Sequence, residues 1–115
     1  MLAKDSRLRK PHEINRVYKR GFYGAGEGVI SVKAWRNGRS SSRAVVVVGK
    51  KVSKRAVVRN TNRRRLSAQL GELWGTVASG YDIVVNVHED TAELAPAKLK
   101  QLLQAALSRA GAIKL

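Results

Sequence analysis

Four consecutive valines, at positions 45–48, are followed at once by the most strongly basic stretch of this 115-residue chain. Eight of the sixteen residues from 50 to 65 are Lys or Arg, and none is acidic. The valine run predicts a strand that is buried on both faces, at the centre of a sheet. The basic run must keep its charge in water, and it needs an anionic partner to offset its self-repulsion. Nucleic acid is the usual partner of such a segment.

The first stretch with helical periodicity lies near the N-terminus. Ile14, Val17 and Tyr18 are spaced as an apolar stripe on one face of a helix. Pro11 suits the first turn of this helix, and Gly21 is well placed as its stop, which gives a length of about ten residues.

Two later segments also predict helices. Ser53 is a suitable cap for a helix that runs from about residue 54 to about residue 74. Asp90 and Glu93 resemble a capping box that opens a last helix over about 91–110.

Strand signals fill most of the remaining sequence. Residues 29–36 alternate as a strand, and the Asn-Gly pair within the turn 37–42 is a strong hairpin signal toward the strand 43–49. Residues 76–88 contain a further buried strand. The glycine-rich stretch 22–28 is expected to be a flexible connector, with one more short strand as the alternative. These elements predict one α+β domain over residues 1–115, in which residues 1–10 are loosely held.

The expected second helix changes character along its length. Arg55, Arg59 and Arg63 lie along one line of the helix, and Leu66 and Leu70 continue nearly the same line. A helix packed along its whole length would not change in this way. We therefore expect its second half to pack on the sheet and its first turns to project as a cationic ledge.

Charge and composition exclude several classes of protein. Residues 1–71 carry 19 Lys and Arg against three acids, whereas residues 73–115 carry four charges of each sign. The chain has no cysteine, which excludes disulfides and thiol chemistry. No apolar run approaches the roughly 20 residues of a membrane span. A cytoplasmic protein that binds RNA or another polyanion is the expectation.

The stretch RAVVVVGKKVSKRAVVRNTNRRR resembles the signature of the bacterial ribonuclease P protein component. In that family a strand opens with a basic residue and ends in paired lysines, an Ala-Val pair follows, and a helix then carries the motif RNRxxKR. The matching residues here are Arg43, Lys50-Lys51, Ala56-Val57, Arg59-Asn60 and Arg63-Arg64. HEINRVYKRG and YDIVVNVHED resemble the family's first helix and fourth strand, so the similarity covers nearly the whole chain in the right order.

Some positions depart from the family pattern. Thr61 stands where the motif usually has Arg, Asn62 stands where an apolar residue is usual, and Ile14 replaces an aromatic residue of the first helix. Ser67-Ala68 replaces a later Arg-Glu pair. The sequence is similar to a divergent member of the family.

The resemblance implies an α-β-β-β-α-β-α sandwich of the ribosomal protein S5 domain 2-like type. It also implies a left-handed crossover around the basic helix, against the usual right-handed rule. The chain would be the protein subunit of a ribonucleoprotein endonuclease that removes the 5′ leader of precursor tRNA. Its partners would be the ribonuclease P RNA subunit and precursor tRNA, with no membrane and no small-molecule substrate. The RNA would perform the cleavage with magnesium bound through the RNA, and this chain would bind no cofactor of its own.

The resemblance and the basic run together give two groups of candidate binding residues. Contacts to the RNA subunit are expected from Lys50, Lys51, Lys54, Arg55, Arg59, Asn60, Arg63, Arg64 and Arg65. Contacts to the leader, in a cleft between the first helix and the sheet, are more weakly expected from Arg16, Tyr18, Lys33 and Arg43.

Two other functions share this composition. A structural ribosomal protein has the same small size, basicity and α+β build. A self-sufficient metal nuclease would need converging carboxylates to hold its ions. The two histidines, His12 and His88, are far apart in the sequence, and helix capping and surface charge account for the late acids, which are Asp82, Glu89, Asp90 and Glu93. No residue of the chain is therefore expected to be catalytic.

Overall fold

A single four-stranded sheet, with the strand order β1-β2-β4-β3, organises the computed structural model, which describes residues 2–114. Strands β1 and β2 are antiparallel, β2 and β4 are antiparallel, and β3 runs parallel to β4. The elements in chain order are η1 (Lys4–Ser6), α1 (Pro11–Arg20), β1 (Phe22–Gly26), β2 (Ile30–Arg36), β3 (Arg43–Val48), α2 (Ala56–Leu73), η2 (Trp74–Thr76), β4 (Tyr81–Val87) and α3 (Pro96–Arg109). The order α-β-β-β-α-β-α confirms the expected fold class.

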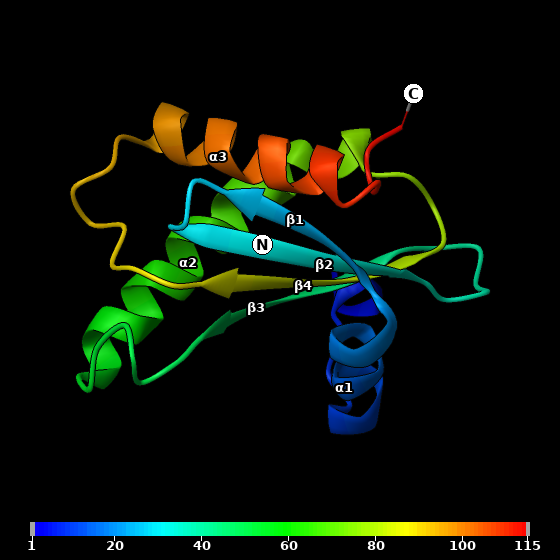
Figure 1. Cartoon of the computed structure of the whole chain (residues 1–115), viewed down its shortest axis with the longest axis horizontal. Coiled ribbons are helices and arrows are strands. Elements are labelled where there is room, and N and C mark those ends of the chain that lie inside the picture. The colour runs from blue at the N-terminus through cyan, green and yellow to red at the C-terminus, as the bar shows by residue number, and fades with distance from the viewer. Residues whose placement is uncertain (1, 115) are drawn as a thin grey trace.

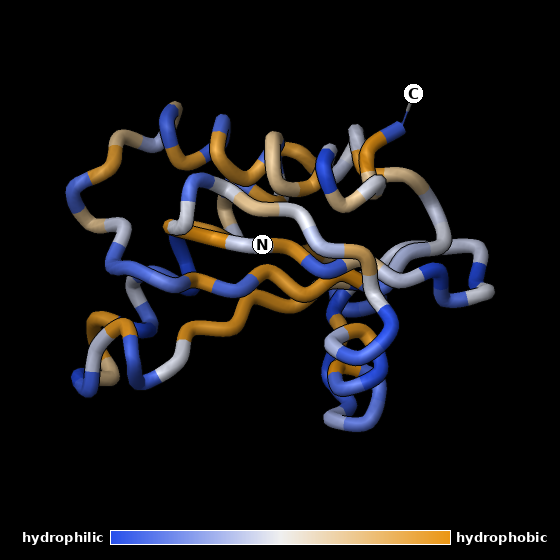
Figure 2. Tube along the Cα trace, viewed as in Figure 1, coloured by the Kyte–Doolittle hydropathy of each residue, from blue (hydrophilic) through white to orange (hydrophobic). Residues whose placement is uncertain are grey.

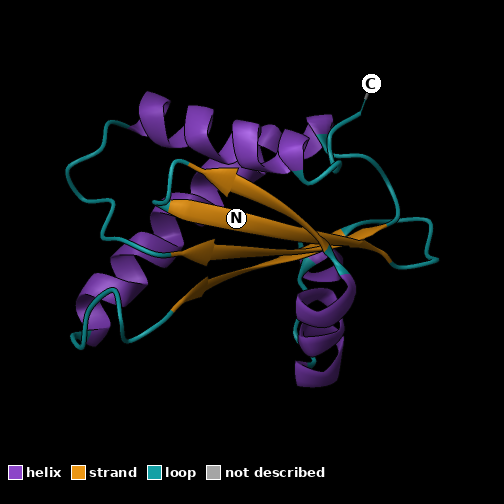
Figure 3. Ribbon diagram, viewed as in Figure 1, coloured by secondary structure: helices purple, strands orange, loops and turns teal. Residues whose placement is uncertain are grey.

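Helices cover the two faces of the sheet unequally. Helices α2 and α3 pack on one face and on each other, while α1 packs alone on the other face, against β2 and β4 (Figures 1 and 3). Each face has its own hydrophobic cluster, and hydrophobic residues follow the strands between them (Figure 2). Because α1 is short, it covers only one end of its face.

The N-terminal segment reaches the outer edge of β3. Leu8 is 2% exposed and joins the cluster beneath α1. Its backbone N–H donates to the Ala44 carbonyl at 2.9 Å, and Arg7 forms an isolated parallel bridge with Ala44. Part of the segment 1–10, which was expected to be loosely held, therefore contacts the sheet; Met1 lies outside the described residues.

Three of the predicted elements are confirmed. Helix α1 begins at Pro11, and Val17 is buried while Ile14 and Tyr18 pack beside it. Strand β2 directs Ile30, Val32 and Ala34 toward the larger core. Strand β4 is the buried strand expected within residues 76–88.

Residues 22–26 form strand β1. The alternative prediction of a short strand in this stretch is confirmed, and the prediction of a flexible connector was wrong. The glycines, which made the strand hard to predict from the sequence, allow it to pack closely on α3. A methyl group at Gly24 would overlap the Ala106 carbonyl oxygen and lie 2.7 Å from the Ala110 nitrogen. Only glycine lets the backbone of α3 approach β1 this closely.

Strand β3 lies at the edge of the sheet, so the prediction of a central strand was wrong. Asn37 and Gly38 form a turn, but the turn does not close a hairpin, because β4 lies between β2 and β3. The valine run is still used on both faces. Val46 and Val48 join the larger core, and the two valines that alternate with them pack on the cluster beneath α1.

The last two helices begin later than predicted. Helix α3 begins at Pro96, five residues beyond the start expected from the capping box, because Asp90 instead caps a turn by accepting the Ala92 N–H at 3.0 Å. Helix α2 begins at Ala56, and Ser53 Oγ accepts the Arg55 N–H at 3.1 Å just before it. Within residues 2–114, none of the helices combines the length and the apolar character that crossing a membrane requires.

The contact between β1 and α3 predicts a specific sensitivity at Gly24. Gly24→Ala should lower the free energy of unfolding by about 2–3 kcal/mol, because the added methyl group meets backbone that cannot move aside. Gly49→Ala is the control, since its methyl group would meet nothing within 4 Å. Urea denaturation of both variants measures the difference, and equal stabilities would contradict the close packing of α3 on β1.

Candidate nucleic-acid interface

The first turns of α2 and the loop before them project beyond the sheet (Figure 1). The side chains of this region that are both basic and exposed form what we call the basic ledge: Lys50, Lys51, Lys54, Arg55, Arg63 and Arg64. The buried residues of α2 begin only at Asn62 and continue through Leu66, Leu70 and Leu73. The predicted change from a projecting basic half to a packed apolar half is confirmed.

Arg59 and Asn60 position the residues of the basic ledge through hydrogen bonds within the protein. The Arg59 Nη1 donates to the carbonyl oxygens of Ser53 at 3.0 Å and Lys54 at 2.9 Å, so this half-buried side chain holds the preceding loop against the helix. Asn60 Oδ1 accepts from Arg63 Nη1 at 2.6 Å. Arg63 is thereby oriented while its side chain stays exposed.

Arg65 has a different environment from its neighbours. Its guanidinium donates to the carbonyl oxygens of Thr91 and Leu94 and to Thr91 Oγ1, which lies 3.2 Å away. These contacts fasten α2 to the loop between β4 and α3. Of the nine residues expected to contact an RNA subunit, Arg65 is therefore the one whose guanidinium is most fully used within the protein.

Asn62, a departure from the family pattern, completes the same connection. It is 1% exposed, and its amide nitrogen donates to Val58 O and Asp90 Oδ1, each at 3.0 Å. Its oxygen accepts from the backbone N–H of Thr91 at 2.8 Å and from the Thr91 hydroxyl at 2.6 Å. A buried amide with four such contacts specifies one arrangement of the loop. Thr61, the other departure in the motif, donates to Val57 O at 2.9 Å within the helix.

The contacts of Asp90 make this connection depend on pH. The hydrogen bond from Asn62 lowers the pKa of Asp90, and the Ala92 N–H and the charge of Arg65 act in the same direction. Since the folded pKa is below the unfolded value of about 3.9, the stabilising contribution is complete above that pH. It is lost as the pH falls through the lower folded pKa.

A second polar surface lies beside α1, on the sheet face that α2 and α3 leave open. The Tyr18 hydroxyl donates to Asn86 Oδ1 at 2.7 Å, and Lys33 Nζ donates to the Tyr18 carbonyl at 2.7 Å. Burial raises the pKa of Tyr18 and keeps its hydroxyl protonated. We call the row Tyr18, Lys33 and Asn86 the α1 groove. It continues toward a hollow of about 220 Å³ lined by residues that include Lys51, Asn86 and His88.

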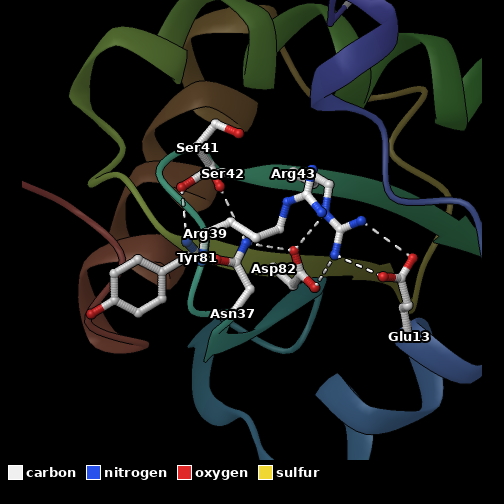
Figure 4. Close-up of polar contacts among 8 residues, drawn as sticks. All are labelled: Glu13, Asn37, Arg39, Ser41, Ser42, Arg43, Tyr81 and Asp82. Carbon is white, nitrogen blue, oxygen red and sulfur yellow. Dashed lines mark hydrogen bonds and ion pairs between the residues drawn. The ribbon is translucent and has the colours of Figure 1, made fainter.

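Of the four expected leader contacts, the structure brings Tyr18 and Lys33 directly together. Arg16 lies on the exposed side of α1, with its Cζ 5.2 Å from the centre of the Trp35 ring. Arg43 shares the same face of the sheet but points its guanidinium at two carboxylates (Figure 4).

The Arg43 side chain is the centre of a buried charge network. It is 13% exposed and lies 2.7 Å from Asp82 Oδ2 and 3.0 Å from Glu13 Oε2. The hydrogen bond to Asp82 raises the pKa of Arg43. Asp82 also accepts from Asn37 Nδ2 at 2.9 Å. The interpretation of Asp82 as surface charge was therefore wrong, because this carboxylate of β4 is 1% exposed and forms an ion pair with Arg43 of β3.

The histidines and acids do not gather into a reactive centre in the part of the chain that the structure describes. His12 is exposed on α1, and His88 Nε2 lies 2.7 Å from Ser31 Oγ. No three side chains of His, Asp or Glu among residues 2–114 converge in a way that could hold a metal ion. The chemistry that these surfaces offer is binding, through cations, amides and aromatic rings.

Comparison with known proteins gives one consistent result. The family model described as "Ribonuclease P" matches residues 2–111. The ribonuclease P protein component of Roseiflexus castenholzii is 35% identical over 109 residues, which cover 94% of this chain and 88% of the relative. That of a Cyanothece species is 32% identical over 125 residues, with 96% and 95% covered.

Solved structures show the same similarity. The Staphylococcus aureus ribonuclease P protein superposes with a TM-score of 0.80 at 22% identity, covering 95% of this chain and 98% of that one. The Thermotoga maritima ribonuclease P protein, in complex with 1-(4-fluorophenyl)-2-thiourea, gives a TM-score of 0.78 at 26% identity, with 90% and 98% covered. The first of these likenesses concerns the fold alone.

The different environments of adjacent arginines predict different effects of substitution. Arg65→Ala should lower the free energy of unfolding by about 2 kcal/mol, because it removes charge-assisted hydrogen bonds to the loop after β4. Arg64→Ala, one residue away and exposed, should change it by less than about 0.5 kcal/mol. Thermal or urea unfolding measures both variants. An Arg65→Ala protein as stable as the unsubstituted protein would show that this contact does not hold the loop in place.

Proposed function

The chain belongs to the ribonuclease P protein family, and we propose that it uses two separate surfaces, the basic ledge for the RNA subunit and the α1 groove for the 5′ leader of precursor tRNA. It is the protein component of a ribonucleoprotein endoribonuclease of tRNA processing, and it associates with the ribonuclease P RNA. The bacterial cytoplasm, where precursor tRNA is made, is the compartment that we propose for this activity.

The charge of the basic ledge is the observation that carries the first assignment. No Asp or Glu occurs between Glu27 and Glu72, so the exposed cations of the ledge have no acid within their own segment to pair with. Phosphates of an RNA would supply the missing charge, and the planar guanidinium groups of Arg63 and Arg64 suit bidentate contacts to phosphate. Lys50 and Lys51 extend the same surface from the end of β3.

Arg59, Asn60 and Arg65 support this surface in a more indirect way. Arg59 holds the loop that carries Lys54, and Asn60 orients Arg63. Arg65 fixes α2 to the loop before α3. Their proposed contribution to RNA binding is to position the exposed cations.

The α1 groove suits a single strand of RNA. Lys33 offers an ammonium group to phosphate, and Tyr18 and Asn86 offer an aromatic ring and an amide to bases. Arg16, held over Trp35, is a further cation beside this path. Arg43 contributes by fixing α1, since its guanidinium is occupied by Asp82 and Glu13.

The protein then assists cleavage without a reactive group of its own. The described residues do not provide a ligand set for a catalytic metal, so we propose that the magnesium ions of the holoenzyme are held by the RNA, which cleaves the leader. The cations of the ledge would neutralise phosphates that otherwise require metal ions. The ledge and the groove would together hold substrate and RNA subunit in one particle.

Reconstitution tests this function. The purified chain, its cognate RNA subunit and a precursor tRNA are combined at a low magnesium concentration, at which the RNA alone is nearly inactive. The protein should restore removal of the 5′ leader. The absence of any gain would refute the proposal, and cleavage by the chain without RNA would show instead that the protein carries its own active site.

Salt dependence tests the basic ledge. Arg63→Ala and Arg64→Ala should each weaken binding to the RNA subunit and reduce the slope of log K against log salt by about one charge. Arg39→Ala removes the same charge from the exposed turn at the other end of the sheet and should leave the slope unchanged (Figure 1). Filter binding over a range of salt concentrations measures all three, and equal slopes would place the RNA elsewhere.

A further inference from the structure

Two aromatic side chains at the start of β1 are left in water. Among residues 2–114, the large hydrophobic residues with exposed side chains are Phe22 at 72%, Tyr23 at 59% and Val57 at 58%. Val57 lies on the first turn of α2, between Arg55 and Arg63 of the basic ledge. Phe22 and Tyr23 are adjacent on an edge strand, where exposed apolar groups are a liability unless they have a use.

The register of β1 places these two rings on opposite faces of the sheet. Tyr23 is paired with Lys33 across the strands, and Phe22 is paired with Ala34. Directly paired residues point to the same face, and neighbouring residues along a strand point to opposite faces. Tyr23 therefore shares the face of Lys33, and Phe22 shares the face of Ala34, which belongs to the core beneath α3.

Tyr23 extends the α1 groove to the edge of the sheet. Paired side chains on adjacent antiparallel strands have Cβ atoms about 5 Å apart, so the ring stands beside the Lys33 side chain. Lys33 in turn contacts the Tyr18 carbonyl, and Tyr18 contacts Asn86. The row thus runs from β4 across β2 to β1. The exposed cations Lys19 and Arg20 end α1, one residue before β1 begins.

We propose that Tyr23 stacks on a base of single-stranded RNA where the strand leaves the α1 groove across β1. The inference rests on the proposed function of that groove and adds a base contact beyond it. A flat ring that stands free beside an ammonium group, on a chain of formal net charge +15, has the combination that binds single-stranded nucleic acid. Stacking accepts any base, so this contact would add affinity with little dependence on sequence.

Leader length provides the test, with the reconstituted holoenzyme and precursor tRNAs that differ only in their leaders. Tyr23→Ala should weaken binding of a substrate whose leader is long enough to reach β1, by at least about fivefold. It should not change binding of a substrate whose leader ends inside the groove. Tyr23→Trp should retain the affinity for the long leader, because it keeps an aromatic face.

Phe22→Ala is the matched control. It removes an equally exposed aromatic ring from the adjacent position but from the other face, so the affinity for the long leader should stay unchanged. Phe22→Ala and Tyr23→Ala could instead lose the same affinity for the long leader, or either variant could change the oligomeric state measured by sedimentation. Either result would assign the aromatic pair to a protein contact and overturn the proposal.

The outcomes also separate this inference from the proposed function. If the unsubstituted protein binds the long leader no better than the short one, or if Tyr23→Ala distinguishes them equally well, the stacking contact is refuted while leader binding in the groove still stands. If the unsubstituted protein binds a leader that ends inside the groove no more tightly than a substrate without a leader, the groove itself does not bind the leader and both proposals fail.

Discussion

The ion pair between Arg43 and Asp82 is the interaction on which the arrangement of this protein depends. The two residues are paired in the parallel register of β3 and β4, which are brought together from opposite ends of helix α2. The second carboxylate on Arg43, from Glu13, fixes α1 over the same end of the sheet. Breaking a buried pair leaves an uncompensated charge, so each partner depends on the others. One guanidinium therefore determines where α1 stands, and with it one wall of the groove.

The arginines divide into those that build the protein and those that are available to a ligand. Arg43, Arg59 and Arg65 have their donors directed at carboxylates and carbonyl oxygens of the chain. Arg64 and the lysines of the loop before α2 are exposed. A net charge counted from the sequence thus overstates the charge offered to RNA. The internal arginines instead provide the rigidity that lets a few exposed cations act as one surface.

The sequence indicated the elements more reliably than their positions in the sheet. The periodicity of α1 and the stripe of α2 followed from side-chain spacing alone. Strand β1 was obscured because its glycines serve a contact with α3, which lies far away in the sequence. The edge position of β3 was hidden because its valines are packed on both faces, and the local sequence does not show which strands neighbour β3. At the interface, charge identified the ledge, but only tertiary contacts showed that Arg65 and Arg43 are committed internally.

The central position of β4 has a consequence for synthesis of the chain. Neither β2 nor β3 gains its shared neighbour until residue 87 has been made, and α3, which closes the core, follows later still. The basic segment therefore emerges from the ribosome well before the sheet that supports it can form. Domains generally fold as units, so the basic segment lacks its supporting sheet until β4 has been made. Completion of the fold converts that indiscriminate segment into a surface of fixed shape.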